Sequence, residues 1–143
     1  MTVGAQEAIR ALLHRYARAC DDHDPAAVTA CFTPDGTFTS SAGTFAGHEQ
    51  IAAFYASALT GSGPMAPPAE SLHQMSNVDV TLVTPTTAHT SLDALVHRWS
   101  PHDHTLTIRA LRYEDEVHEL GTNWLLHHRT HTLRWHTTVP TYR

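Results

Sequence analysis

The hydrophobic period of this chain changes near residue 70, and that change limits its fold more than any other feature. Apolar side chains recur at helical spacing from about Ala5 to about Asp21, whereas the later residues form long runs rich in Thr, Val, Leu and aromatic residues. Spacing of three or four residues favours helices, and β-branched and aromatic runs favour strands. The sequence therefore predicts helices first and strands afterwards, the element order of an α+β domain.

Three helices are predicted before residue 60. The first, ending near Asp21, has one apolar face that should be buried. Asp24 followed by Pro25 predicts the N-cap and the first position of a second, short helix. A third helix is expected after Gly47. Its apolar side would consist of Ile51, Phe54, Tyr55, Ala58 and Leu59.

Short connections separate these elements. Residues 33–36, Thr-Pro-Asp-Gly, are typical of a turn, and residues 37–39 and 44–45 predict two short strands. The stretch from Thr60 to Glu70 has the proline and glycine content of a loop and is long enough to act as a lid or an entrance.

Long strands are predicted in the second half of the chain. They are expected at residues 72–83, 88–99, 105–117 and 123–136, separated by short Pro- or Gly-containing turns. Short turns join antiparallel neighbours, so we expect a meander. A strongly twisted sheet folded over three helices leaves a conical pocket between the two layers.

Length and composition fit one domain over residues 1–143. The chain is 41% hydrophobic and 16% charged, which excludes a disordered protein. Fourteen Asp and Glu against nine Lys and Arg, with no basic run, argue against a nucleic-acid partner. No apolar stretch approaches the roughly 20 residues of a membrane span, and the N-terminus does not resemble a signal peptide. We expect a cytoplasmic protein in which Cys20 and Cys31 are reduced thiols.

Six segments in a fixed order resemble the SnoaL-like polyketide cyclase and scytalone dehydratase-like branch of the nuclear transport factor 2-like superfamily. They are AIRALLHRYARACDDHD, CFTPDGTF, FAGHEQIAAFY, LHQMSN, LRYEDEV, and NW followed by LRW. The resemblance covers nearly the whole chain. It implies a cone-shaped α+β barrel with three N-terminal helices packed on a strongly curved, mostly antiparallel sheet. It also implies an apolar pocket at the wide end and a homodimer formed through the outer face of the sheet.

The resemblance places the chemistry at Asp21, at the end of the first helix, and at His73, at the start of the first long strand. Asp21 has independent support, because a carboxylate at a helix C-terminus faces the negative end of the helix dipole, which disfavours it by roughly 0.3–1 kcal/mol. Its alternative role is to bind water or a loop amide. Strand alternation groups His73 with Met75 and Asn77, opposite Val80, and so does not by itself bury the histidine. Together the two would form a general acid/base dyad, with the carboxylate fixing the imidazole tautomer.

Substrate contacts are expected from residues on most of these elements. They are Tyr16, Phe38, Phe54, Tyr55, Met75, Asn77, His97, Leu111, Tyr113 and Trp135. The aromatic members could equally be plain core residues. On the third long strand Arg109 shares the pocket face, whereas Arg112 points away. Few cations appear placed to hold phosphate, so we expect a compact neutral ligand. The positions of two carbonyl-holding tyrosines of scytalone dehydratase fall on Cys20 and Ser40, which argues against scytalone itself.

The sequence thus predicts a cofactor-independent dehydratase, isomerase or cyclase that acts on a small apolar carbonyl compound, such as a polyketide-like secondary metabolite. A non-catalytic binding or assembly module would share the fold without needing the dyad. An epoxide hydrolase of the limonene type needs an Asp-Arg-Asp arrangement, and no central strand has an Arg-x-Asp pair.

The thirteen histidines raise the question of a metal. Several lie on the last predicted strand, including His127, His128, His131 and His136. No cysteine or carboxylate stands at a spacing that completes a closed site with them, so no metal site is expected.

Overall fold

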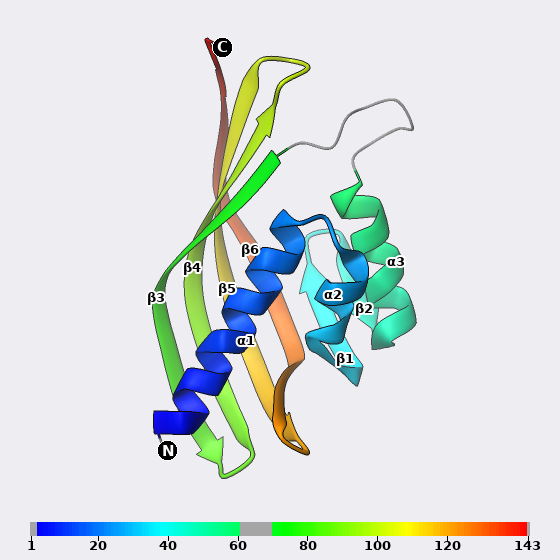
Figure 1. Cartoon of the computed structure of the whole chain (residues 1–143), viewed down its shortest axis with the longest axis vertical. Coiled ribbons are helices and arrows are strands. Elements are labelled where there is room, and N and C mark those ends of the chain that lie inside the picture. Colours follow the sequence, from blue (N-terminus) through cyan, green and yellow to red (C-terminus); the bar gives the residue numbers. More distant parts are fainter. Residues whose placement is uncertain (1–2, 61–69, 143) are drawn as a thin grey trace.

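Three helices cover one face of a six-stranded sheet in the computed structural model, which describes residues 3–60 and 70–142 (Figure 1). The helices are α1 (Val3–Asp21), α2 (Pro25–Ala30) and α3 (Gly47–Leu59). The strands are β1 (Phe32–Ser40), β2 (Gly43–Ala46), β3 (Glu70–Thr84), β4 (Thr87–Ser100), β5 (Thr105–Leu120) and β6 (Asn123–Pro140). The predicted α+β fold is therefore confirmed. The loop predicted from Thr60 to Glu70, with its suggested role as a lid or entrance, falls largely on residues 61–69, outside the described part.

The sheet has the strand order β2-β1-β6-β5-β4-β3. Strands β3 to β6 pair antiparallel with their neighbours in sequence, which confirms the predicted meander. Strand β1 lies parallel to β6, with Phe38 opposite Arg129, and this pairing brings the β1–β2 hairpin beside the meander. Figure 1 shows α1 running across the meander and α3 beside the hairpin. The space between helices and sheet therefore has walls from both halves of the chain.

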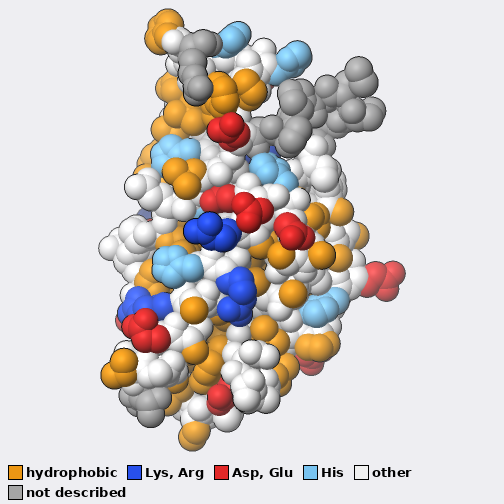
Figure 2. All heavy atoms as spheres, in the orientation of Figure 1, with side chains coloured by type: hydrophobic (Ala, Val, Ile, Leu, Met, Phe, Trp, Pro, Cys, Tyr) orange, Lys and Arg blue, Asp and Glu red, His pale blue; other side chains and the backbone are white. Residues whose placement is uncertain are grey.

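Helix α1 buries the face that its apolar spacing predicts, whereas on α3 Ile51 and Tyr55 are buried and Ala58 of the predicted face is exposed. Ile9, Leu12 and Tyr16 of α1 are buried against the sheet, while charged side chains gather over its exposed side (Figure 2). Asp24 caps α2 by accepting a hydrogen bond from the backbone N–H of Ala27 at 3.0 Å. This cap confirms the start of α2 that the Asp24-Pro25 sequence predicts.

The turn predicted at residues 33–36 is wrong. These residues lie inside β1, where pairing with β6 is interrupted between Phe32 and Thr37. The Pro-Asp-Gly sequence forms an irregularity rather than a reversal because the segments on both sides of it pair with the same strand.

Strand β3 changes face at Asn77. Its pairing with β4 is interrupted between Ser76 and Asp79, and Asn77 has a left-handed φ of 52°. The irregularity shifts the alternation, so His73 and Val80 both lie on the half-buried side of the strand. The predicted placement of these two residues on opposite faces is therefore wrong.

Strand β6 changes face at Arg134. Leu133 pairs with Leu111 of β5, and Trp135 pairs with the adjacent Ala110, so Arg134 is the extra residue of a bulge. The bulge turns Trp135 away from the helices, and its side chain is 54% exposed.

Candidate active site

A cavity of about 210 Å³ lies between the helices and the covered face of the sheet. Its size suits a compact ligand rather than a nucleotide or a long chain. Helices α1 and α3 supply one wall, and strands β1 and β3 to β6 supply the other. The predicted substrate-contacting residues that line it are Tyr16, Phe38, Phe54, Tyr55, Leu111 and Tyr113.

Asp21 and His73 are joined by two hydrogen bonds. His73 Nδ1 lies 2.6 Å from Asp21 Oδ1, and the backbone N–H of His73 donates to Asp21 Oδ2 at 2.9 Å. The hydroxyl of Ser71 donates to Asp21 Oδ1 at 2.8 Å. His73 lines the cavity, and Asp21 lies behind it in the groove between α1 and β3. Asp21 and His73 can meet because α1 ends beside the start of β3.

The carboxylate of Asp21 is held in its charged form. Burial raises its pKa, but the hydrogen bonds from His73 and Ser71 and the electrostatic interaction with His73 outweigh burial, so the pKa lies below its ordinary value. A charged Asp21 keeps the proton of a neutral His73 on Nδ1, and Nε2 is then the basic nitrogen available to the cavity.

The prediction of substrate contact is wrong for Met75, Asn77, His97 and Trp135, which do not line the cavity. Met75 packs against the core in the groove beside α1. Asn77 is exposed and donates a hydrogen bond to Asp93 at 3.0 Å.

His97 and Trp135 face the uncovered side of the sheet. Val96 and Arg98 line the cavity, so alternation turns His97 to the opposite side. Its Nδ1 atom is buried and has no hydrogen-bond partner among the described residues. Trp135 is turned outward by the bulge at Arg134. Trp124 is buried in the core and does not line the cavity.

Several cavity residues could have been found by simple alternation. Ser71 lies two residues before His73, and Arg98 lies two residues after Val96, on the same faces of their strands. The cavity also takes in Cys20 and Ser40, the two positions where scytalone dehydratase was expected to carry tyrosines.

A buried ion pair supports the tyrosines of the cavity. Arg129 and Asp115 have side chains 1% and 0% exposed, and the guanidinium donates to the two carboxylate oxygens at 2.7 and 2.8 Å. Thr90 donates to the same carboxylate at 2.7 Å. The guanidinium carbon lies 4.2 Å from the ring centres of both Tyr16 and Tyr113. The Arg129–Asp115 ion pair therefore holds the rings of Tyr16 and Tyr113 in place at the wall of the cavity.

The tyrosines of the cavity are hydrogen-bond donors rather than bases. The hydroxyls of Tyr16 and Tyr55 are hydrogen-bonded to each other. Burial raises the pKa of Tyr16, Tyr55 and Tyr113, so all three stay protonated at neutral pH.

His131 enters the cavity in its neutral form. Burial lowers its pKa to about 4, and the positive charge of Arg109 adds to the effect. Its Nδ1 atom is buried without a hydrogen-bond partner among residues 3–60 and 70–142. The ring packs against those of Phe38 and Tyr113.

Replacing His131 with Gln should make the fold less sensitive to acid. Histidine in the unfolded chain titrates near pH 6.5, whereas folded His131 titrates at about 4, so the unfolded chain binds more protons between these values. Above pH 6.5 the wild type should keep its full free energy of unfolding. As the pH falls to 4, protonation of His131 in the unfolded chain should lower that free energy by up to about 3 kcal/mol. Urea unfolding at pH 7 and pH 4.5 measures the difference. Equal losses in the two proteins would contradict this explanation.

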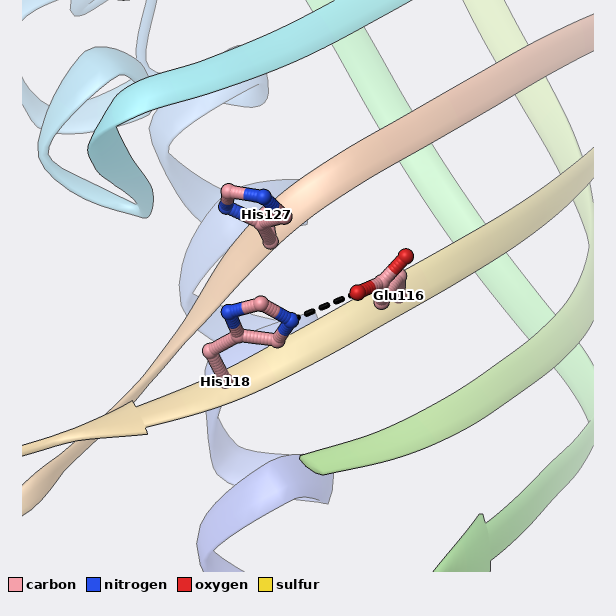
Figure 3. Close-up of side chains that lie close together, drawn as sticks. All are labelled: Glu116, His118 and His127. Carbon is pink, nitrogen blue, oxygen red and sulfur yellow. Dashed lines mark hydrogen bonds and ion pairs between the residues drawn. The ribbon is translucent and has the colours of Figure 1, made fainter. Parts of the chain in front are cut away.

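One cluster outside the cavity has side chains that could hold a metal. Glu116 and His118 of β5 and His127 of β6 offer ligand atoms within 4.8 Å of one another, and they lie together in Figure 3. His118 Nε2 is 2.6 Å from Glu116 Oε1. Strand pairing brings Glu116 to these histidines, a contact that spacing along the sequence does not predict. Val117 and Tyr113 point to the covered face, so Glu116 and His118 point away from the cavity.

The fold of the chain is shared with proteins of the nuclear transport factor 2-like, or cystatin-like, class. A nuclear transport factor 2-like protein with a cystatin-like fold from Novosphingobium aromaticivorans is 23% identical, with 90% of this chain and 81% of that chain covered and a TM-score of 0.73. A protein named as a candidate scytalone dehydratase from the same organism is 18% identical, covers 99% and 89%, and has a TM-score of 0.81. A hexachlorocyclohexane dehydrochlorinase, LinA-type3, from Novosphingobium barchaimii is 14% identical, covers 99% and 95%, and has a TM-score of 0.82.

The family to which the chain belongs is identified from its sequence. A family model of the SnoaL-like domain matches residues 1–130, so the chain belongs to the SnoaL-like domain family. No curated protein matches the chain significantly. None of the helices within residues 3–60 and 70–142 has both the length and the apolar character that crossing a bilayer requires.

Proposed function

We propose that this protein is a cofactor-independent acid/base enzyme, a dehydratase, isomerase or cyclase, acting on a small carbonyl compound such as a polyketide-like secondary metabolite. The observation that carries the proposal is the hydrogen bond of 2.6 Å between Asp21 and His73 at the wall of a cavity lined by both aromatic and polar side chains. A carboxylate so placed orients the imidazole and stabilises the imidazolium that forms when Nε2 takes a proton.

The reaction would proceed by proton transfer through His73. Nε2 removes a proton from a carbon next to the carbonyl or from a hydroxyl, and the bonding electrons move toward the carbonyl oxygen. The hydroxyls of Tyr16 or Tyr113 are in the cavity to donate hydrogen bonds to that oxygen. The imidazolium then returns its proton to a departing hydroxide, giving water, or to another carbon of the rearranged framework. Asn77, which the sequence predicts to contact the substrate, is hydrogen-bonded to Asp93 outside the cavity.

Proton abstraction can be tested before the substrate is known. Cyclic ketones and polyketide-like compounds incubated with the enzyme in D₂O should exchange their acidic C–H protons, which NMR detects without net turnover. We expect exchange to be catalysed by the wild type and to persist after dialysis against a chelator. Binding of these compounds without any exchange would favour a non-catalytic binding module, and loss of exchange with the chelator would contradict the cofactor-independent mechanism.

We also propose that two copies associate through the uncovered face of the sheet. Leu95 of β4, Ala110 of β5 and Trp135 of β6 are paired side by side there, and Leu95 and Trp135 are 37% and 54% exposed. An apolar row of this kind on a sheet is typical of a contact between protein surfaces.

Light scattering should therefore give twice the chain mass of 15.8 kDa at micromolar concentration. Trp135→Glu should shift the mass toward 15.8 kDa because it places a charge in the apolar row. His14→Glu, at an exposed position of α1 on the covered side of the sheet, serves as the control and should leave the dimer intact. A wild-type mass of one chain would refute the proposal.

A further inference from the structure

We infer that the molecule bound in this cavity is a carboxylate, held by Arg98 and Arg109 beside the Asp21–His73 pair. The inference rests on the proposed function, in that it takes this cavity as the substrate site. It replaces the expectation of a neutral ligand that the sequence alone favours.

Both arginines line the cavity from neighbouring strands. Arg109 of β5 pairs with Val96 of β4, and Arg98 is two residues further along β4. Side chains in this diagonal relationship, on the same face of a sheet, can reach a common point when they are as long as arginine. The two guanidinium groups can therefore act on one anion.

Neither arginine forms an ion pair within residues 3–60 and 70–142. No carboxylate lies within 4.0 Å of Arg98 or Arg109 in the described part of the chain, and the sequence of residues 61–69 contains no Asp or Glu. Asp103 lies along the same open groove outside the cavity but forms no ion pair with either. By contrast, Arg112 and Arg129 each hold a carboxylate at 2.7 Å.

The wall of the cavity offers no acidic side chain to these cations. No Asp or Glu is among the described residues that line it, and Asp21 is already committed to His73 and Ser71. Half-buried guanidinium groups without a counter-ion are unfavourable, and an anionic ligand removes that penalty. A cationic pair in a cavity that also contains Phe and Tyr rings is therefore suited to a ligand with one anionic and one apolar end.

The sheet register places the cationic end next to the dyad. Ser71 pairs with Arg98, and His73 pairs with Val96, which in turn pairs with Arg109. Neighbouring strands are roughly 4.8 Å apart, so a carboxylate held by the arginines lies within a few bonds of the atom that faces His73. The rings of Phe38 and Phe54 line another part of the cavity. The ligand is thus a ring-bearing acid whose reactive position is close to its carboxylate.

Two matched probes test the inference, namely 2-naphthoate and 2-naphthamide, which share shape and differ in charge. In calorimetric titrations the wild type should bind the carboxylate about 10- to 100-fold more tightly than the amide, as expected for charge-assisted hydrogen bonds. Arg98→Gln and Arg109→Gln should each lower the affinity for the carboxylate about tenfold and leave the affinity for the amide unchanged. Arg112→Gln is the control, since it removes the same charge from the opposite face of β5 and should change neither affinity.

Equal affinity for the two probes in the wild type, or no carboxylate binding at millimolar concentration, would overturn the inference. A carboxylate preference that survives in the Arg98→Gln/Arg109→Gln double variant would do the same, because the anion would then lie elsewhere. These results are independent of the deuterium exchange assay. Exchange without carboxylate preference would refute only the ligand class, and carboxylate preference without exchange would refute only the acid/base function.

Discussion

Replacing His73 with Ala should lower turnover by about 10²–10⁴-fold, the usual contribution of a positioned general acid or base. The reason is that His73 lines the cavity and presents an imidazole whose Nδ1 is held 2.6 Å from the carboxylate of Asp21. Initial rates on the first substrate identified by exchange would measure the effect. The side chains of His73 and Asp21 are 9% and 18% exposed, so water can replace the lost hydrogen bond and the melting temperature should change little.

The Asp21→Asn variant should also lose much of the turnover rate, although the shape of the site is retained. A neutral amide cannot stabilise the imidazolium, and its NH₂ group can select the wrong imidazole tautomer. Asp22→Asn is the matched control, because Asp22 is adjacent in sequence but exposed and not part of the dyad. His89→Ala controls for the loss of an imidazole from an exposed position. Full activity of both dyad variants would refute the mechanism.

The largest effect on stability is expected from Arg129→Met. The substitution leaves Asp115, with its side chain 0% exposed, as a buried carboxylate without its cation. Removing one partner of such a pair typically lowers the free energy of unfolding by about 3–5 kcal/mol. Urea unfolding at pH 7 would show the loss, and the tyrosine rings that the guanidinium supports should lose their fixed near-UV signal.

A second variant separates the unpaired charge from simple loss of packing. Arg129→Met combined with Asp115→Leu removes both charges, and buried pairs replaced in this way are often as stable as the original. The double variant should therefore recover much of the lost stability. Arg112→Met breaks the exposed pair with Asp93 and should have a much smaller effect. A double variant no more stable than Arg129→Met would show that the charge is not the cause.

The helices and the meander could be predicted because local signals determine them. The apolar face of α1 and the Asp24-Pro25 start of α2 depend on residues that are neighbours in sequence. The parallel pairing of β1 with β6 has no such local signal, because it joins segments far apart in the chain. The same is true of Glu116, which reaches His127 only through strand pairing.

The candidate site could be predicted best on β5, where alternation continues without interruption along the cavity. Arg109, Leu111 and Tyr113 line the cavity, as the period of two requires. The predictions that Asn77 and Trp135 line the cavity are wrong for one shared reason. Each residue lies at or just beyond an extra residue that reverses the alternation of its strand. A bulge is set by pairing with the neighbouring strand, so the sequence of a single strand does not locate it.

The pairing of β1 with β6 also determines when the cavity can form during synthesis. Thr37 and its partner residue His128 are 91 positions apart, and the chain between them must leave the ribosome first. At about 5–20 residues per second, the helices and the β1–β2 hairpin wait several seconds for their last strand. During that time Phe38 lacks the partner strand beside which it is buried. A nascent chain halted before residue 123 should therefore be a chaperone client, with no partly formed site to bind a ligand.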